Sequence, residues 1–316
     1  PPVAILSSTP PGPAPAPTPG GPPVKAAFFT VFPSIILPMF LAMVDQTIVA
    51  AALPAIAAEL GDVDRISWIV IAYLVATTIA APVYGRLGDL LGRKRLMMAA
   101  LVLFILASVA CAAATSVEML AVARILQGAG GGGLMTLSQA LIGESVPPRE
   151  RARYQGFLAT VGVASSAFGA VAGGLLTQYL GWRSIFLVPL PVGVLALVLV
   201  RRLPTRPMVQ SGPFRFDGLG LFLFAVFIAS TLVMLYELQQ LQPGSTPLLL
   251  MLLGASVFAV VVLIWREQRA SDPLLPLSLL RTPAIWRSSA LALAHGGMLV
   301  SLATFVPIYL RVVHGA

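Results

Sequence analysis

Charged residues and cysteines are scarce in this chain of 316 residues. Only 10% of the residues are Asp, Glu, Lys or Arg, 58% are hydrophobic, and the mean hydropathy is +0.91. Soluble domains carry about 25% charged residues, so the composition excludes a water-soluble protein and indicates an integral membrane protein. The single cysteine, Cys111, excludes an intrachain disulfide, and we expect it to pack as a small apolar side chain.

The motifs of most enzymes are also missing. The sequence has no cluster of metal ligands, no Gly-x-x-x-x-Gly-Lys-Ser/Thr phosphate loop and no Ser/His/Asp set. It therefore predicts no cofactor, no metal site and no enzymatic activity. The net charge of +8 would suggest nucleic acid in a soluble protein, but these bases lie between apolar runs, so no nucleic-acid partner is expected.

Long apolar runs dominate the chain after a tail, residues 1–24, whose Pro- and Ala-rich composition predicts disorder. The runs are long enough to cross a hydrocarbon layer of about 30 Å as helices. They predict an all-α protein with nine membrane spans: Phe28–Ala52, Trp68–Tyr84, Leu96–Ala114, Met119–Ile142, Phe157–Tyr179, Ile185–Val200, Leu219–Leu238, Leu248–Trp265 and Ser289–Leu310.

The basic residues predict the orientation of these spans. With the N-terminus in the cytoplasm, nearly all of the 20 Lys and Arg residues fall in inner segments. The exceptions are Arg65, Arg183 and Arg311 outside, and Arg124 within the fourth span. Because cytoplasmic loops carry an excess of Lys and Arg, the N-terminus is predicted to be cytoplasmic.

Two charges lie inside the spans. A carboxylate such as Asp45 in a membrane helix costs about 2.5–3.5 kcal/mol on insertion scales, so it either takes up a proton or a cation, or makes a structural hydrogen bond to a neighbouring helix. Arg124 shares a helix face with Gln127 and Gly128. It either steers a proton to or from a carboxylate, or snorkels to the outer interface.

Small residues form faces on the fourth and fifth spans, where helix backbones can approach closely. Such faces serve static packing as well as moving helices. The residues concerned are Gly128 on the fourth span and Gly162, Gly169 and Gly173 on the fifth.

The loop between the second and third spans reads Gly85-x-Leu87-Gly88-Asp89-x-x-Gly92-Arg93-Lys94-x-Leu96. It closely resembles the loop between the second and third helices of the major facilitator superfamily. The run from Val122 to Gly130 resembles the fourth-helix motif of that family, and Gly169–Gly174 its fifth-helix antiporter motif, with Ala170 where a proline is usual.

Two further segments, Asp45–Pro54 and Gly181–Phe186, are similar to hallmarks of the fourteen-helix drug:proton antiporters. The resemblance implies a multi-pass protein of the plasma or inner membrane that exports hydrophobic or cationic drugs in exchange for protons. It also implies a six-helix bundle over residues 25–203, a linker with two extra helices over 204–270, and the start of a second bundle over 271–316.

The resemblance also implies roles for single residues. Asp45 and Arg124 would couple transport to protons, and Gly169, Gly173 and Gly174 would serve the bending and close packing of the fifth helix. The cytoplasmic gating loop would comprise Gly85, Asp89, Gly92, Arg93 and Lys94.

A fourteen-helix transporter needs five more spans after the ninth, so we expect the sequence to be a fragment or a truncated product. Such transporters bind substrate between two halves. The alternative hypothesis is a truncated protein that no longer transports and acts as a sensor or assembly partner.

Overall fold

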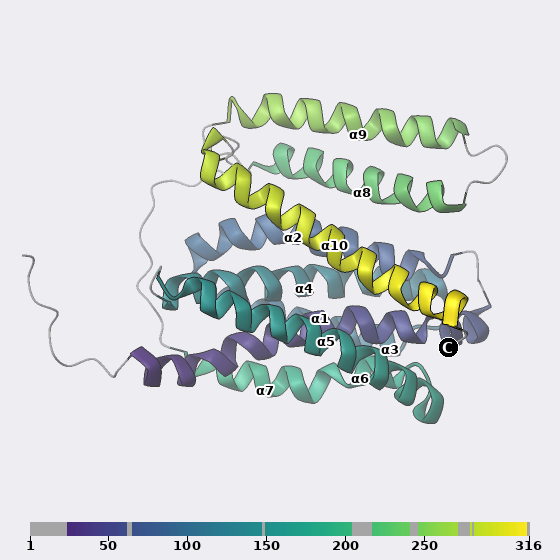
Figure 1. Cartoon of the computed structure of the whole chain (residues 1–316), viewed down its shortest axis with the longest axis horizontal. Helices are drawn as coiled ribbons and strands as arrows, with labels where there is room; N and C mark the ends of the chain where they lie inside the picture. The colour runs from purple at the N-terminus through teal and green to yellow at the C-terminus, as the bar shows by residue number, and fades with distance from the viewer. Residues whose placement is uncertain are drawn as a thin grey trace, which may run out of the picture.

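A computed structural model of the chain describes residues 24–61, 65–146, 149–203, 217–240, 246–270, 279 and 281–314. The predicted tail and parts of both predicted inter-domain boundaries lie outside these residues. The described residues are almost entirely helical (Figure 1). The helices are α1 (Val24–Leu60), α2 (Trp68–Leu91), α3 (Arg93–Ala112), α4 (Val117–Ser145), α5 (Arg151–Leu180), α6 (Ser184–Leu187), α7 (Pro189–Arg201), α8 (Gly218–Gln240), α9 (Thr246–Glu267) and α10 (Pro283–His314).

These helices confirm the predicted all-α membrane fold. Helical backbone satisfies its own hydrogen bonds, which is the requirement that hydrocarbon places on a spanning segment. In the described part of the chain, seven helical segments are long and apolar enough to cross a membrane. The glycine-rich α4 is not among these seven.

The sixth predicted span is divided into α6 and α7 at Val188. Pro189 and Pro191 lack the N–H that would continue the helical ladder, so the break follows from the sequence. Counted with α6 and α7 as one segment, the described residues contain nine helical segments at the positions of the nine predicted spans, and seven of these segments meet the length and hydropathy of a membrane span.

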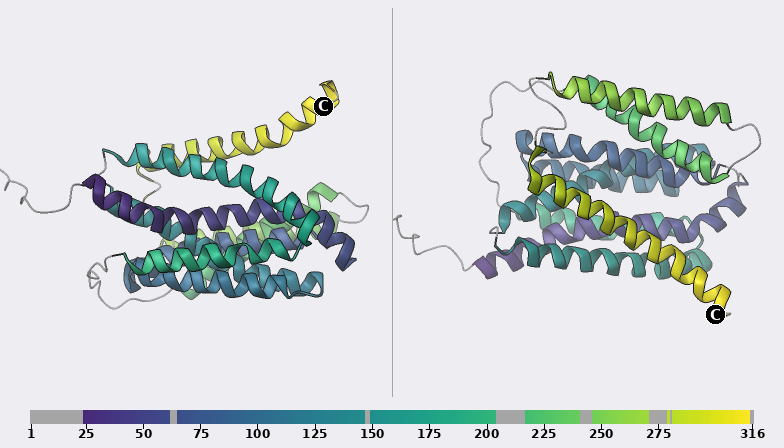
Figure 2. Two further views of the ribbon diagram at one scale, coloured as in Figure 1. Left: turned by 90° about the horizontal axis from the view of Figure 1, so that it is seen from below. Right: turned by 45° about the horizontal axis from the view of Figure 1, so that its top comes forward.

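Helices α1 to α7 form the bundle, in which α4 packs against α2 and α3, and α1 packs against α5. The pair α8 and α9 attaches through contacts of α8 with α2, and α10 crosses the bundle obliquely (Figures 1 and 2). Thr231 of α8 and Ser256 of α9 share a hydrogen bond of 2.7 Å, which joins the two helices of the pair.

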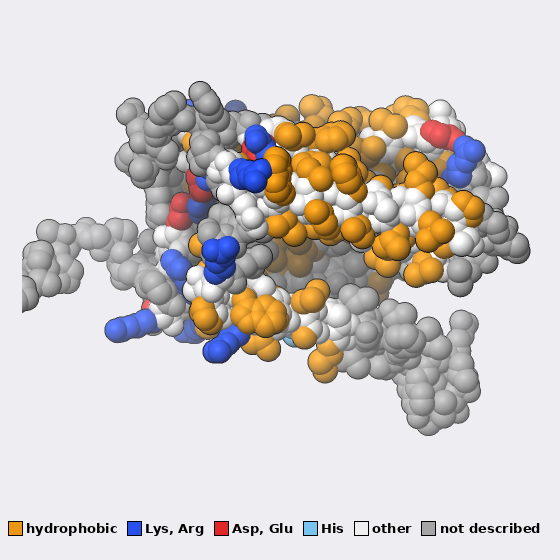
Figure 3. Space-filling model, turned by 90° about the horizontal axis from the view of Figure 1, so that it is seen from above, with side chains coloured by type: hydrophobic (Ala, Val, Ile, Leu, Met, Phe, Trp, Pro, Cys, Tyr) orange, Lys and Arg blue, Asp and Glu red, His pale blue; other side chains and the backbone are white. Residues whose placement is uncertain are grey.

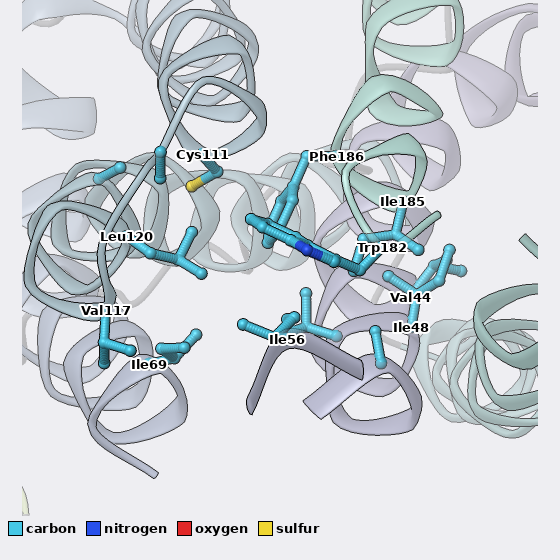
Figure 4. Packing of buried hydrophobic residues seen from close by; sticks show 14 residues of the cluster. Val44, Ile48, Ile56, Ile69, Cys111, Val117, Leu120, Trp182, Ile185 and Phe186 are labelled. Carbon is cyan, nitrogen blue, oxygen red and sulfur yellow. The ribbon is translucent and has the colours of Figure 1, made fainter. Parts of the chain in front are cut away.

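Three clusters of buried apolar side chains fill the described part of the bundle. One cluster contains Ile48 and Ile56 of α1, Leu120 of α4 and Trp182. The indole of Trp182 extends between Phe186 and Ile56 (Figure 4). A second cluster lies further along the same helices and includes Leu41, Phe104 and Leu134, and a third contains Ile35 and Ile142. Asp45 and Arg124 are buried next to two members of the first cluster, Val44 and Ala123.

Trp182 lies just before the sixth predicted span, a position typical of rings that anchor helix ends at the interface. Its side chain is instead 2% exposed, and its Nε1 donates a hydrogen bond of 2.8 Å to Glu59. Arg183 pairs with the same carboxylate and donates to the carbonyl of Ala114. This segment therefore ties together the ends of α1, α3 and α6.

Candidate proton-coupling site

Asp45 and Arg124 form an ion pair in the centre of the bundle. Asp45 Oδ2 lies 2.5 Å from Arg124 Nη1, and the two side chains are 0% and 1% exposed. Arg124 Nε also donates to the carbonyl of Ile69 on α2, over 3.4 Å. The pair thus joins three helices, and its enclosure shows that the snorkelling alternative for Arg124 is wrong.

Gln127 connects both members of this pair. Its Nε2 donates to Asp45 Oδ1 over 2.8 Å and to Ser108 Oγ over 2.9 Å. Its Oε1 accepts from Arg124 Nη1 over 2.7 Å and from the Cys111 thiol over 3.3 Å. The amide therefore has two donors and two acceptors satisfied, which a buried amide requires.

Neither Ser108 nor Cys111 was predicted to contribute to this site. Both lie in the apolar run of α3, and the sequence alone does not indicate which residue a hydroxyl or thiol in such a run would bond to. Cys111 was expected to pack as a small apolar side chain. It is fully buried, as expected, but it also donates to Gln127.

Tyr73 lies beneath the guanidinium of Arg124, with 4.0 Å between Cζ and the ring centroid. A tyrosine near the start of a span is typically an interfacial ring. Tyr73 is instead 1% exposed, and its hydroxyl donates to the carbonyl of Ala42 on α1.

Asp45 also borders a small cavity of about 90 Å³ between α1, α5 and the junction of α6 and α7. The other walls are apolar and include Phe40, Phe168 and Pro189. Pockets for drug-sized ligands measure about 300–1,000 Å³, so this cavity does not hold such a ligand in the present conformation.

The glycines on α4 and α5 differ in what surrounds them. A β-carbon on Gly128 would lie 2.5 Å from the carbonyl oxygen of Tyr73, and one on Gly173 would lie 2.6 Å from that of Ile48. Gly169 is packed as closely against Thr47, and Gly162 lies near the end of Met43. A β-carbon on Gly174 would meet nothing within 4 Å, so the close packing does not extend to this residue.

The predicted loop between the second and third spans is helical except at Gly92, and its charged side chains reach the end of α4. Gly92, with φ of 89°, turns the chain between the two helices. Arg93 pairs with Asp89 over 2.7 Å and with Glu144 of α4 over 3.1 Å, and it donates to the carbonyl of Ala140.

Two other residues of the predicted gating loop also contact neighbouring helices. Lys94 Nζ donates to the carbonyl of Leu203, just after α7, over 2.5 Å. Gly85 faces α4, where a β-carbon would be in ordinary contact with Thr136. The loop therefore bridges α2, α3, α4 and the end of α7.

The sequence matches the Major Facilitator Superfamily over residues 35–316, which is most of the chain. The chain belongs to the major facilitator superfamily. Its fold agrees with this assignment: the structure resembles that of the proton:xylose symporter XylE, with a TM-score of 0.54 and 17% identity, over 92% of this chain and 63% of that one.

Curated relatives of this superfamily member include transporters from bacteria and fungi. An uncharacterised MFS-type transporter of Mycobacterium tuberculosis is 36% identical over 90% of this chain and 42% of its own length. The multidrug transporter MdtP of Bacillus subtilis is 30% identical, over 89% of this chain and 52% of its own. The efflux pump dotC of Dothistroma septosporum is 33% identical, over 89% and 49%.

The chain thus spans about half the length of the curated relatives it matches. It is a multi-pass membrane protein of a transporter family, and its relatives are transporters and not enzymes.

Proposed function

We propose that the full-length protein exports hydrophobic or cationic drugs from the cytoplasm in exchange for protons, by alternating access. The observation that carries this proposal is the enclosed pair of Asp45 and Arg124, which links α1 to α4 in the middle of the bundle. The names of the relatives MdtP and dotC support multidrug transport and efflux.

The chemistry of the pair suits a proton carrier. A buried ion pair contributes little net stability, because desolvation of both charges offsets their attraction. Ionisable groups inside membrane segments usually serve a transport or proton pathway. Protonation of Asp45 would remove the charge that holds Arg124, so uptake of a proton would alter the link between α1 and α4.

The distribution of charge supports a cytoplasmic N-terminus and the inner or plasma membrane as the location. Figure 3 shows Lys and Arg side chains gathered at one end of the molecule and hydrophobic side chains along its middle. Under the positive-inside rule, the basic end faces the cytoplasm. That end carries the loop of Asp89 and Arg93, which would hold the cytoplasmic side closed.

The alternative, a membrane protein that no longer transports, is not favoured. A protein freed from transport has no need to retain a costly buried acid, its arginine partner and the amide that connects them. All three are present, and they contact one another.

The experiment measures efflux of a fluorescent lipophilic cation, such as ethidium, from cells that express the full-length protein. We expect a protonophore to stop efflux, and Asp45→Asn to reduce it at least tenfold. Glu118→Gln is the matched control, since it makes the same change in an exposed ion pair with Arg65. Efflux that persists with Asp45→Asn would exclude the proposed coupling.

A further inference from the structure

The guanidinium of Arg124 lies over the ring of Tyr73, with 4.0 Å between Cζ and the ring centroid. This contact remains available whether Asp45 is ionised or protonated. The face of an aromatic ring attracts a cation, and the attraction is stronger where water is excluded. Tyr73 and Arg124 are each 1% exposed, so this contact lies in a dry part of the bundle.

The glycines of α4 make room for this ring. A β-carbon on Gly128 would collide with the backbone of Tyr73, and one on Gly131 would collide with its hydroxyl. The hydroxyl in turn donates to the carbonyl of Ala42 over 3.2 Å. The ring is thus fixed by α1, α2 and α4, and part of the glycine run of α4 is explained by the need to accommodate it.

Protonation of Asp45 would leave the Arg124 cation without a counter-charge. Asp45 is the only carboxylate that pairs with Arg124 within the described residues. The titratable groups facing Asp45 are Arg124 on α4, Tyr73 on α2 and Cys111 on α3. The side chains that α5, α6 and α7 present to it around the cavity are uncharged.

Three contacts of Arg124 do not need a charge on Asp45. They are the ring of Tyr73, the Oε1 atom of Gln127 and the carbonyl of Ile69. The carbonyl lies at 3.4 Å, a long hydrogen bond. The ring and the amide oxygen are therefore the groups placed to retain the cation.

We propose that Tyr73 is a positioning residue for the coupling pair, whose ring holds the Arg124 cation in place while Asp45 carries a proton. The inference rests on the proposed function. The ring attracts the Arg124 cation in both states of Asp45, but its electron-rich face also disfavours a carboxylate close by, so it stabilises the pair less when Asp45 is ionised. The ring thereby sets the pH at which transport changes.

The test is the pH dependence of transport by the full-length protein, purified and reconstituted into liposomes, with ethidium as the probe. Tyr73→Leu removes the ring, and we expect the pH midpoint to fall by about one unit, a tenfold loss of proton affinity. Tyr73→Phe is the matched control, since it keeps the ring and loses the hydroxyl, so its midpoint should equal that of the unchanged protein. If Tyr73 had a purely structural role, both variants would show less folded protein or a lower maximal transport rate, and both pH midpoints would stay in place. That result would overturn the inference.

A second set of variants covers the case in which Tyr73→Leu does not fold. Fluorinated phenylalanines at position 73 keep the shape of the ring but weaken its negative face, so the midpoint should fall with each added fluorine. An unchanged midpoint across this series overturns the role of the ring, even where Asp45→Asn abolishes the pH dependence and the proposed function stands. If transport by the Asp45→Asn variant still depends on pH, the proposed function and the inference are both overturned.

Discussion

The carbonyl oxygen of Ile48 lies 2.6 Å from the point where a β-carbon on Gly173 would stand. Here α1 and α5 pack with their backbones in contact, and nearby Thr47 donates to the carbonyl of Ser165 across the same interface. Small residues permit such approaches in membranes, where van der Waals packing drives helix association.

Gly173→Ala should therefore destabilise the protein, and Gly174→Ala should not. The first variant forces α1 and α5 apart, at a cost of about 1–3 kcal/mol for overpacking. The second adds its methyl group where nothing lies within 4 Å, so we expect no loss and a gain of up to about 1 kcal/mol from helix propensity. Thermal unfolding of the purified protein in detergent measures both. Equal destabilisation by the two variants would contradict the close approach at Gly173.

Because Asp45 and Arg124 form an ion pair, the effects of replacing them on the free energy of unfolding should be strongly non-additive. Asp45→Asn or Arg124→Gln alone leaves a buried charge without its partner, and each should cost about 3–5 kcal/mol. The double variant removes both charges and should recover a large part of this loss. Unfolding of the three variants at one pH gives the coupling energy from a double-mutant cycle. Additive effects would mean that the two side chains do not pair.

Arg93 and Asp89, on either side of the turn between α2 and α3, should contribute unequally to stability. Arg93 is 22% exposed and reaches the end of α4, whereas Asp89 is 61% exposed. Arg93→Ala should cost about 1.5–3 kcal/mol, as expected for hydrogen bonds to charged groups, and Asp89→Asn less than about 1 kcal/mol. Proteolysis of the loop in inverted membrane vesicles and thermal unfolding both report this difference. A larger effect of Asp89→Asn would show that Asp89, and not Arg93, maintains the contact with α4.

The sequence was sufficient to predict the membrane helices and the two intramembrane charges. Long apolar runs define spans because hydrocarbon demands them, and Asp45 and Arg124 stand out because charge is costly there. Their pairing could not be predicted, because 79 residues separate them and the register between α1 and α4 depends on packing of the whole bundle.

Aromatic residues show where this reasoning fails. Tyr73 and Trp182 lie near the ends of apolar runs, which is typical of interfacial rings. The same position is compatible with a ring that turns into the bundle, and both rings do so. For Tyr73 the deciding information is the pair Gly128 and Gly131 on another helix, which leaves space for its backbone and hydroxyl.

The predicted orientation leads to a labelling experiment. Thr115, between α3 and α4, and Arg95, near the start of α3, lie toward opposite ends of α3 and are exposed. Thr115→Cys should react with a membrane-impermeant maleimide in intact cells, and Arg95→Cys only after the cells are permeabilised. The chain's own cysteine, Cys111, is fully buried and provides the background measurement. Labelling of Arg95→Cys but not Thr115→Cys in intact cells would reverse the orientation, and would place the loop of Asp89 and Arg93 on the outer side of the membrane.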